Sequence, residues 1–171
     1  MSTLGSFIWS IADQLRGPYR PNQYGNVILP LTILRRLDCI IEPDRETMRE
    51  LAAKYDNPNR LRVAVKKATG RPFYNTSNYS FANLLADADG LADNLTDYID
   101  RFSPDLDVFE YFDFKKEILA LDKAGLLREI ITSFKAVDLH PDVVSNADMG
   151  DAFEYIIRRF NEAANETSGD H

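Results

Sequence analysis

Hydrophobic and polar positions alternate with a helical period along most of the chain. In "SFIWSIADQLRG" the apolar residues recur at spacings of three and four, which places them on one face of a helix. Ser6 is a candidate N-cap for this helix. Gly17 and Pro18 are expected to end it, because proline cannot continue a helix. Asn22 is then placed to cap the next one.

The segment 27–41 is apolar on almost every side. A helix without a polar face belongs at the centre of a bundle. Pro30 removes a backbone donor, so we expect a kink or a helix start near it. The preceding loop, which contains Tyr19, Arg20 and Tyr24, is expected to form a stiff corner near the surface.

Similar patterns predict further helices. One of them is framed by Asn57 as N-cap and Gly70 as the end, with Pro58 at the first helical position. Residues 71–81 are rich in aromatic residues and turn formers and predict a loop or short hairpin. We therefore predict an all-α fold, a single domain over residues 1–171 with about eight helices. The additional helices are expected over residues 45–56, 57–70, 80–90, 91–103, 107–125, 126–138 and 151–169. In the last of these, Phe153, Ile156, Ile157 and Phe160 are expected on one face.

Composition indicates the compartment in which the protein is expected to function. Hydrophobic residues make up 44% of the 171 residues and charged residues 27%, which are ordinary globular values. No apolar run reaches the roughly 18 residues of a membrane helix, and the first 15 residues do not resemble a signal peptide. A lone cysteine, Cys39, needs no oxidising compartment. We expect a cytoplasmic protein that does not interact with membranes.

The net charge of −7 disfavours a general nucleic-acid coat protein, but the charge is unevenly distributed. Residues 54–72 contain six basic residues and one acid, whereas residues 138–170 contain eight acids and two arginines. In "NRLRVAVKKATGR" the cations fall largely away from an apolar stripe, so they are available either to phosphates or merely to solvent. The candidate DNA-contact residues are Arg60, Arg62, Lys66, Lys67 and Arg71, with a second group formed by Arg16, Arg20, Arg35 and Arg36.

Signals of catalysis are few. The chain has two histidines, His140 and His171. Asp138 and Asp142 flank His140, a pattern more typical of a turn before a helix than of a metal site or a hydrolase. No glycine-rich phosphate or cofactor loop is present in the sequence. We expect no catalytic, cofactor-binding or metal-binding residues in this chain.

The opening stretch "FIWSIADQLRGPYRPNQYGNVILPLTILRRLDCII" resembles the start of the methylation (M) subunit of type I restriction-modification systems. The resemblance continues in "FYNTSNYSFANLL" and from Val143 to the last residue. The motifs that carry it are Trp9, Arg16-Gly17, Tyr24-Gly25, Leu29-Pro30 and Arg35-Arg36-Leu37-Asp38.

The resemblance implies a helical N-terminal domain that precedes an adenine-N6 methyltransferase domain using S-adenosylmethionine. It also implies two M subunits and one specificity subunit on double-stranded DNA, joined by a restriction subunit in the full enzyme. The N-terminal domains would help to enclose the duplex and to bring the M subunits together.

The family's catalytic and cofactor motifs are not in this sequence. We therefore expect a piece of a longer protein that is inactive alone. The alternative is a pure protein-protein assembly module with no direct DNA contact.

Overall fold

The computed structural model describes residues 3–168, with side chains described as far as Phe160. The described residues form helices and no strands, which confirms the all-α class with about eight helices; α6 is a single turn. The elements are α1 (Thr3–Leu15), η1 (Pro21–Gln23), α2 (Gly25–Ile41), η2 (Glu42–Asp44), α3 (Arg45–Lys54), α4 (Pro58–Thr69), η3 (Leu84–Ala86), α5 (Leu91–Asp100), α6 (Val108–Tyr111), α7 (Phe114–Lys123), α8 (Leu127–Ala136) and α9 (Asn146–Ser168).

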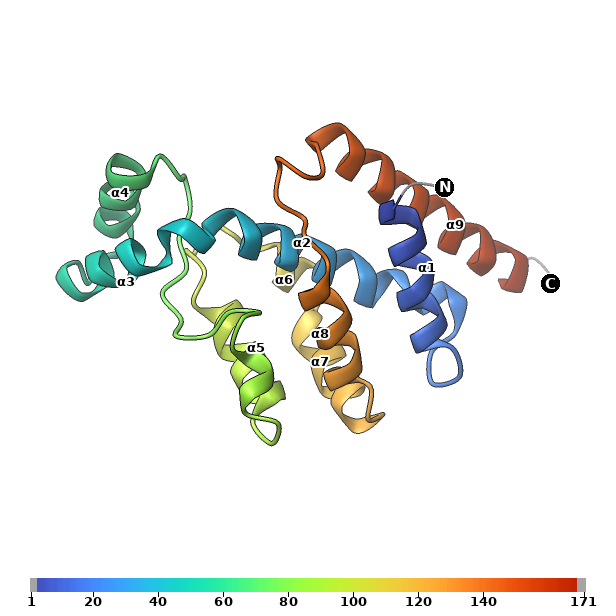
Figure 1. Ribbon diagram of the computed structural model, residues 1–171. Helices are drawn as coiled ribbons and strands as arrows, with labels where there is room; N and C mark the ends of the chain where they lie inside the picture. The colour runs from blue at the N-terminus through green and yellow to red at the C-terminus, as the bar shows by residue number, and fades with distance from the viewer. Residues whose placement is uncertain (1–2, 169–171) are drawn as a thin grey trace.

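Helix α2 is the central element of the fold. It crosses the molecule, with α1 at its first half and the α3–α4 hairpin at its far end, while α9 runs alongside it from Arg36 back to Tyr24. Helices α5, α7 and α8 lie below α2 in the view of Figure 1. Val27, Ile28, Leu31 and Leu34 are fully buried. The predicted central position of this helix is confirmed, and burial of its apolar surface is the main source of its stability.

The start of α2 differs from the prediction. The helix begins at Gly25, so Pro30 lies inside it rather than at its start. Asn22 belongs to η1 and does not cap α2. Ser6 likewise lies within α1, which begins at Thr3. Both predicted caps were therefore wrong: α1 begins before Ser6, whereas η1 separates Asn22 from the start of α2.

The corner between α1 and α2 is buried more deeply than expected. The ring of Tyr24 packs edge-on against Phe160 of α9, with 5.4 Å between centroids. The hydroxyl of Tyr19 donates to a carboxylate oxygen of Glu117 at 3.1 Å, and only 9% of this tyrosine is exposed. Of the three residues expected at the surface, only Arg20 is exposed.

The α3–α4 hairpin follows the sequence closely. The Asn57 side chain accepts hydrogen bonds from two backbone N–H groups of the first turn of α4, at 2.9 and 3.1 Å. Gly70 ends the helix with a φ of +80°, which only glycine adopts freely. Leu61 and Val65 are buried and fix α4 on the rest of the fold. Figure 1 shows the hairpin projecting at the end of α2.

The middle of the chain is less regular than predicted. Residues 71–81 form a loop whose only bridge joins Asn75 to Phe102 among the described residues, so the hairpin alternative is wrong. The predicted helix over 80–90 is also wrong, because only the short η3 forms there. The Asn83 side chain binds backbone groups within this segment and competes with helix formation.

Two later helices also differ in detail. The predicted helix over 107–125 is divided into α6 and α7 at Asp113, whose φ of +50° is left-handed. Helix α9 begins at Asn146, and the last residue predicted for it, Gly169, lies outside the described residues. Ile156 is buried but Ile157 is 49% exposed, because adjacent helical residues point about 100° apart. None of the helices described is both long enough and apolar enough to cross a membrane.

Candidate nucleic-acid interface

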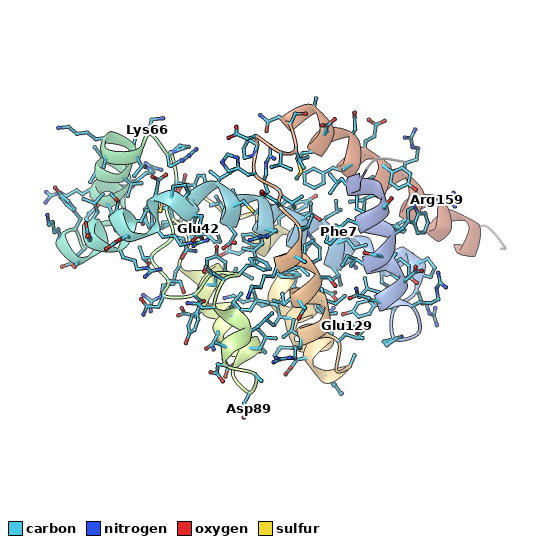
Figure 2. The ribbon with its side chains drawn as sticks, viewed as in Figure 1. Phe7, Glu42, Lys66, Asp89, Glu129 and Arg159 are labelled. Atoms are coloured by element: carbon cyan, nitrogen blue, oxygen red, sulfur yellow. The ribbon has the colours of Figure 1, made fainter. Side chains whose placement is uncertain are left out.

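The outer face of α4 presents cations that the fold leaves unpaired. Arg60, Lys66 and Lys67 are exposed. In the part of the chain that the structure describes, their side chains have no ion pair or hydrogen bond with protein. Figure 2 shows Lys66 pointing away from the hairpin. These groups are hydrated, so a phosphate has only water to displace.

The two other cations of this group are partly engaged. A guanidinium nitrogen of Arg62 lies 3.6 Å from a carboxylate oxygen of Asp105. The Nε of Arg71 donates to Asp44 at 3.2 Å. Both arginine side chains remain more than a third exposed. Because a guanidinium has five donors, each keeps N–H groups that face solvent.

An open hollow of about 550 Å³ lies against α4. Val63 lies beside the hollow and is 67% exposed, which is a large exposed fraction for a valine. A surface that combines cations with an apolar side chain suits a sugar-phosphate backbone, which offers both charge and ribose carbon. The lining residues are Arg62, Val63, Lys66, Lys67, Pro72 and Asp105.

The second predicted group is not one surface. Arg16 forms an exposed ion pair with Asp13 at 2.7 Å, and Arg20 is exposed. Both lie at the corner between α1 and α2, at the opposite end of α2 from α4 (Figure 1). The structure therefore does not bring them together with the α4 cations.

Arg36 lies inside the fold. It is 7% exposed, and its guanidinium donates to the carbonyl oxygen of Leu139 at 2.8 Å, to that of Val144, and to Asn146 Oδ1 at 2.7 Å. Burial lowers the pKa of Arg36. Its donors hold the segment between α8 and α9 against α2, and its burial keeps the guanidinium out of reach of a phosphate.

Arg35 has a similar role one position earlier. Its Nε donates to the carbonyl oxygen of Val137 at 2.9 Å, and a second nitrogen donates to that of Lys135 at 3.1 Å. These carbonyls belong to the end of α8, where helical acceptors lack partners. The third nitrogen binds Asp38 at 2.6 Å. Arg35 and Arg36 thus connect elements about 100 residues apart in sequence.

Asp38 completes a buried polar network that the sequence did not reveal. Only 2% exposed, it accepts hydrogen bonds from Arg35, Arg45, the Tyr98 hydroxyl and the backbone N–H of Phe81. Burial, together with the Asp38 charge, raises the pKa of Tyr98 well above its usual value. The only sequence signal was the spacing of three between Arg35 and Asp38, which permits an ion pair along one helix.

Burial by itself would lower the pKa of Arg45, but the neighbouring Tyr98 and the Asp38 carboxylate raise it instead. The guanidinium therefore stays charged inside the fold and compensates Asp38. It also donates to Glu42 at 2.7 Å, which holds the start of α3 against the end of α2. The network thus fixes the base of the α3–α4 hairpin.

The His140 segment forms the turn that its sequence predicts. The Nδ1 of His140 accepts a hydrogen bond from the N–H of Asp142 at 3.0 Å, and the N–H of His140 donates to Asp138 at the same distance. No group of three potential metal ligands occurs among the described residues. His171 lies outside them.

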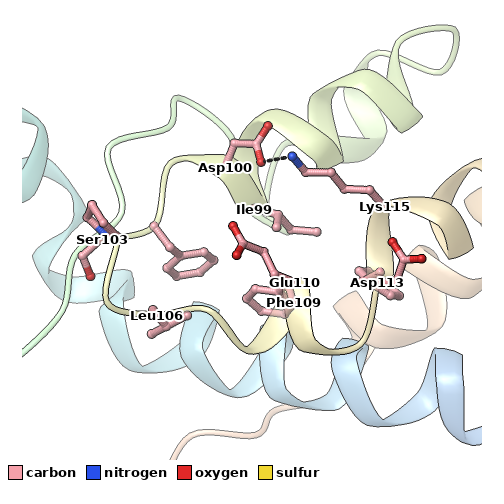
Figure 3. A pocket seen from close by; sticks show the side chains of 11 residues that line it. Ile99, Asp100, Ser103, Leu106, Phe109, Glu110, Asp113 and Lys115 are labelled. Carbon is pink, nitrogen blue, oxygen red and sulfur yellow. Dashed lines mark ion pairs between the residues drawn. The ribbon is translucent and has the colours of Figure 1, made fainter.

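A separate hollow of about 370 Å³ lies between α5, α6 and α7 (Figure 3). Phe102 and Phe109 stack in its wall with 5.7 Å between ring centroids. Lys115 and Asp100 form an ion pair of 2.5 Å at its rim, where Glu110 also lies. Its acidic rim repels phosphate, so it does not extend the α4 surface.

Comparison with known families gives a match over most of the chain. A sequence profile of the HsdM N-terminal domain matches residues 4–134, about three-quarters of the chain. The match contains the α4 surface, the Arg35–Asp38 motif and the whole of α2. No curated protein matches the chain.

Proposed function

The chain belongs to the HsdM N-terminal domain family, the N-terminal domain of the M subunit of type I restriction-modification systems, and from this premise we propose that α4 binds the phosphate backbone of double-stranded DNA. The M subunit is one component of a multi-subunit system. In this domain, the outer face of α4 would contact the duplex.

The observation that carries the proposal is the contrast between two sets of cations. Arg60, Lys66 and Lys67 extend from a projecting hairpin and have no partner among the residues that the structure describes. Arg35 and Arg36 are occupied inside the domain. Exposed cations clustered on one helix can release the counterions of several phosphates, which is the main source of sequence-independent DNA affinity.

The net charge of −7 works against this binding, because most of the molecule repels DNA. The domain alone should therefore bind weakly and with strong salt dependence. In the assembled enzyme, a specificity subunit and a second M subunit would hold the domain beside the duplex. Sequence recognition would then come from the specificity subunit, because phosphate contacts carry no sequence information.

The parent protein would transfer a methyl group from S-adenosylmethionine to adenine N6 in a domain that this sequence does not include. The chain itself would contribute no catalytic or cofactor-binding residue. The domain would function in the cytoplasm, in a complex with DNA that also includes the restriction subunit.

Fluorescence anisotropy with a labelled duplex of about 30 base pairs tests the α4 proposal. Lys66→Glu combined with Lys67→Glu should weaken binding at low salt by at least tenfold. The slope of log K against log salt should fall in magnitude by roughly 0.9 for each lost phosphate contact.

The matched control is Lys116→Glu with Lys123→Glu on α7, which makes the same change in net charge on exposed residues of another helix. It should weaken binding only slightly. Equal losses in the two variants, or no loss in the α4 variant, would show that α4 is an ordinary solvated face.

A second candidate function is subunit assembly without DNA contact. The observation in its favour is the acidic character of residues 138–170. Under this alternative the wild-type chain does not shift the anisotropy of the duplex at any salt concentration, yet still binds a sister subunit.

A further inference from the structure

The hollow between α5, α6 and α7 has the size of a small-molecule site. Its volume of about 370 Å³ falls within the range of roughly 300 to 1,000 Å³ that ligand pockets occupy. Its lining comes from residues 99–115, which cover the end of α5, the whole of α6 and the start of α7 (Figure 3). It is therefore a separate surface from that of α4.

The wall of this hollow is apolar and largely aromatic. The stacked rings of Phe102 and Phe109 belong to it, together with the buried side chains of Ile99 and Phe114. The ring centroids of Phe109 and Phe114 lie 6.4 Å apart, so the aromatic contacts continue from α6 into α7. Such a wall shields the apolar part of a ligand from water, and the faces of aromatic rings also attract cations.

The rim of the hollow is negatively charged. Three carboxylates line it, those of Asp100, Glu110 and Asp113, against the single ammonium of Lys115. The rim therefore has a net charge of −2. A positive ligand would be attracted to it and a negative one repelled.

Two of these carboxylates are not neutralised by the fold. The side chains of Glu110 and Asp113 are exposed and form no ion pair or hydrogen bond among the residues that the structure describes. Asp113 directly precedes α7, whose helix dipole favours a carboxylate there. Glu110 lies in α6, which is a single turn with little dipole of its own. In Figure 3 the Glu110 side chain extends from α6 into the hollow, where a cation would supply the missing partner.

The hollow is preformed because direct contacts join its walls. The ion pair between Lys115 and Asp100 connects α7 to α5 across the rim. The stacking of Phe102 on Phe109 connects the end of α5 to α6. A ligand therefore meets a surface that is already ordered, which favours affinity.

We propose that this hollow binds a small organic cation that has an aromatic body and one ammonium group. The aromatic body would lie against Phe102 and Phe109, and the ammonium would lie between the carboxylates of Glu110 and Asp113. The wall would supply most of the affinity, and the rim would select a positive charge over a neutral or negative one.

The proposal is tested by titrating the isotope-labelled 171-residue chain with three probes of the same shape and following its amide chemical shifts by NMR. The probes are phenylpropylamine, which is an ammonium ion at neutral pH, the neutral phenylpropanol and the anionic phenylpropanoate. The amine should bind at least fivefold more tightly than the alcohol, and the carboxylate should bind most weakly. The largest shifts should fall within residues 99–115.

Glu110→Gln combined with Asp113→Asn removes both free carboxylates and should lower the affinity for the amine to that for the alcohol. Both residues are exposed, and asparagine tolerates the left-handed φ of +50° at position 113, so the variant should fold normally. The matched control, Glu129→Gln with Asp89→Asn, makes the same two changes on exposed residues elsewhere (Figure 2) and should bind the amine as the wild type does.

Equal affinities of the wild-type chain for the amine and the alcohol would overturn the proposal. So would shifts centred outside the hollow, an unchanged affinity for the amine in the Glu110 and Asp113 variant, or no saturable shift at millimolar amine. The proposal does not depend on DNA contact by α4. Lys66→Glu with Lys67→Glu should therefore bind the amine like the wild type, whatever that variant does to DNA binding.

Discussion

Asp38 shows how one side chain can join several elements of the fold. Its two oxygens receive donors from α2, α3, α5 and the loop before η3, and all of these groups are buried or nearly so. A carboxylate buried in this position depends on these donors, because a buried charge without partners strongly destabilises the folded state. The aspartate of the Arg-Arg-Leu-Asp motif is therefore an architectural residue.

Tyr98 makes this network sensitive to alkali. Its folded pKa is raised well above the usual value of 10, so between those two values the folded state keeps a proton that the unfolded state has lost. The contribution of Tyr98 to stability is therefore complete below pH 10 and declines above it, by at most about 1.4 kcal/mol per pH unit. Tyr98→Phe should lower the free energy of unfolding by about 2 kcal/mol at neutral pH. It should also reduce the fall in the free energy of unfolding as the pH rises above 10. Urea unfolding between pH 8 and pH 12 measures both effects.

Tyr111→Phe is the control, because this tyrosine is 84% exposed. It should leave the profile unchanged. An alkaline decline of unchanged steepness in Tyr98→Phe would mean that another group titrates there.

At the scale of the elements, α4 shows which features could be predicted. Asn57, Pro58 and Gly70 act within a few residues of their own positions, so their roles were evident from the sequence. The burial of Tyr24 depends on Phe160, more than a hundred residues away, and was missed. The division at Asp113 was missed as well, because no glycine or proline marks it.

The candidate site was predicted to a similar extent. Local charge density correctly identified α4 as a helix with outward cations. It could not show that Arg35 and Arg36 face carbonyl oxygens of a segment about 100 residues later. Charge along a sequence shows where cations are, whereas tertiary contacts decide which of them stay free. DNA contact itself remains a prediction.

The cap of α4 allows a direct test of the hairpin. Asn57→Ala removes the acceptor for two N–H groups and should destabilise α4 by about 1 kcal/mol. Hydrogen exchange of the α4 amides should accelerate roughly fivefold while the amides of α2 keep their protection. Asn59→Ala, also exposed in the first turn, should have little effect. Equal acceleration in α2 would mean that the hairpin unfolds only together with the whole domain.

At the scale of the whole molecule, the core extends beyond the residues that the family profile matches. Leu139, Met149, Ile156 and Phe160 are buried in the same core as α1 and α2. The Arg36 guanidinium also takes its acceptors from this region. The folding unit is therefore longer than the matched segment of residues 4–134.

A chain that ends at residue 134 should not fold cooperatively. It would expose the surfaces that α9 covers and leave the buried Arg36 without acceptors, at a cost of several kcal/mol. Circular dichroism and thermal unfolding should show reduced helicity and no sharp transition. A chain that ends at Ser168 should unfold as the wild type does, and a sharp transition in the shorter chain would place the complete core within residues 4–134.

Helix α2 also sets the distance between two ends of the domain. Its 17 residues form a rod about 25 Å long, with the corner to α1 at its beginning and the α3–α4 hairpin at its end. Tilting such a rod by 10° about one end moves the other by about 4 Å, roughly the reach of one hydrogen-bonded ion pair. Any change in the direction of α2 at that corner would therefore displace the hairpin by a distance that grows with the length of the helix.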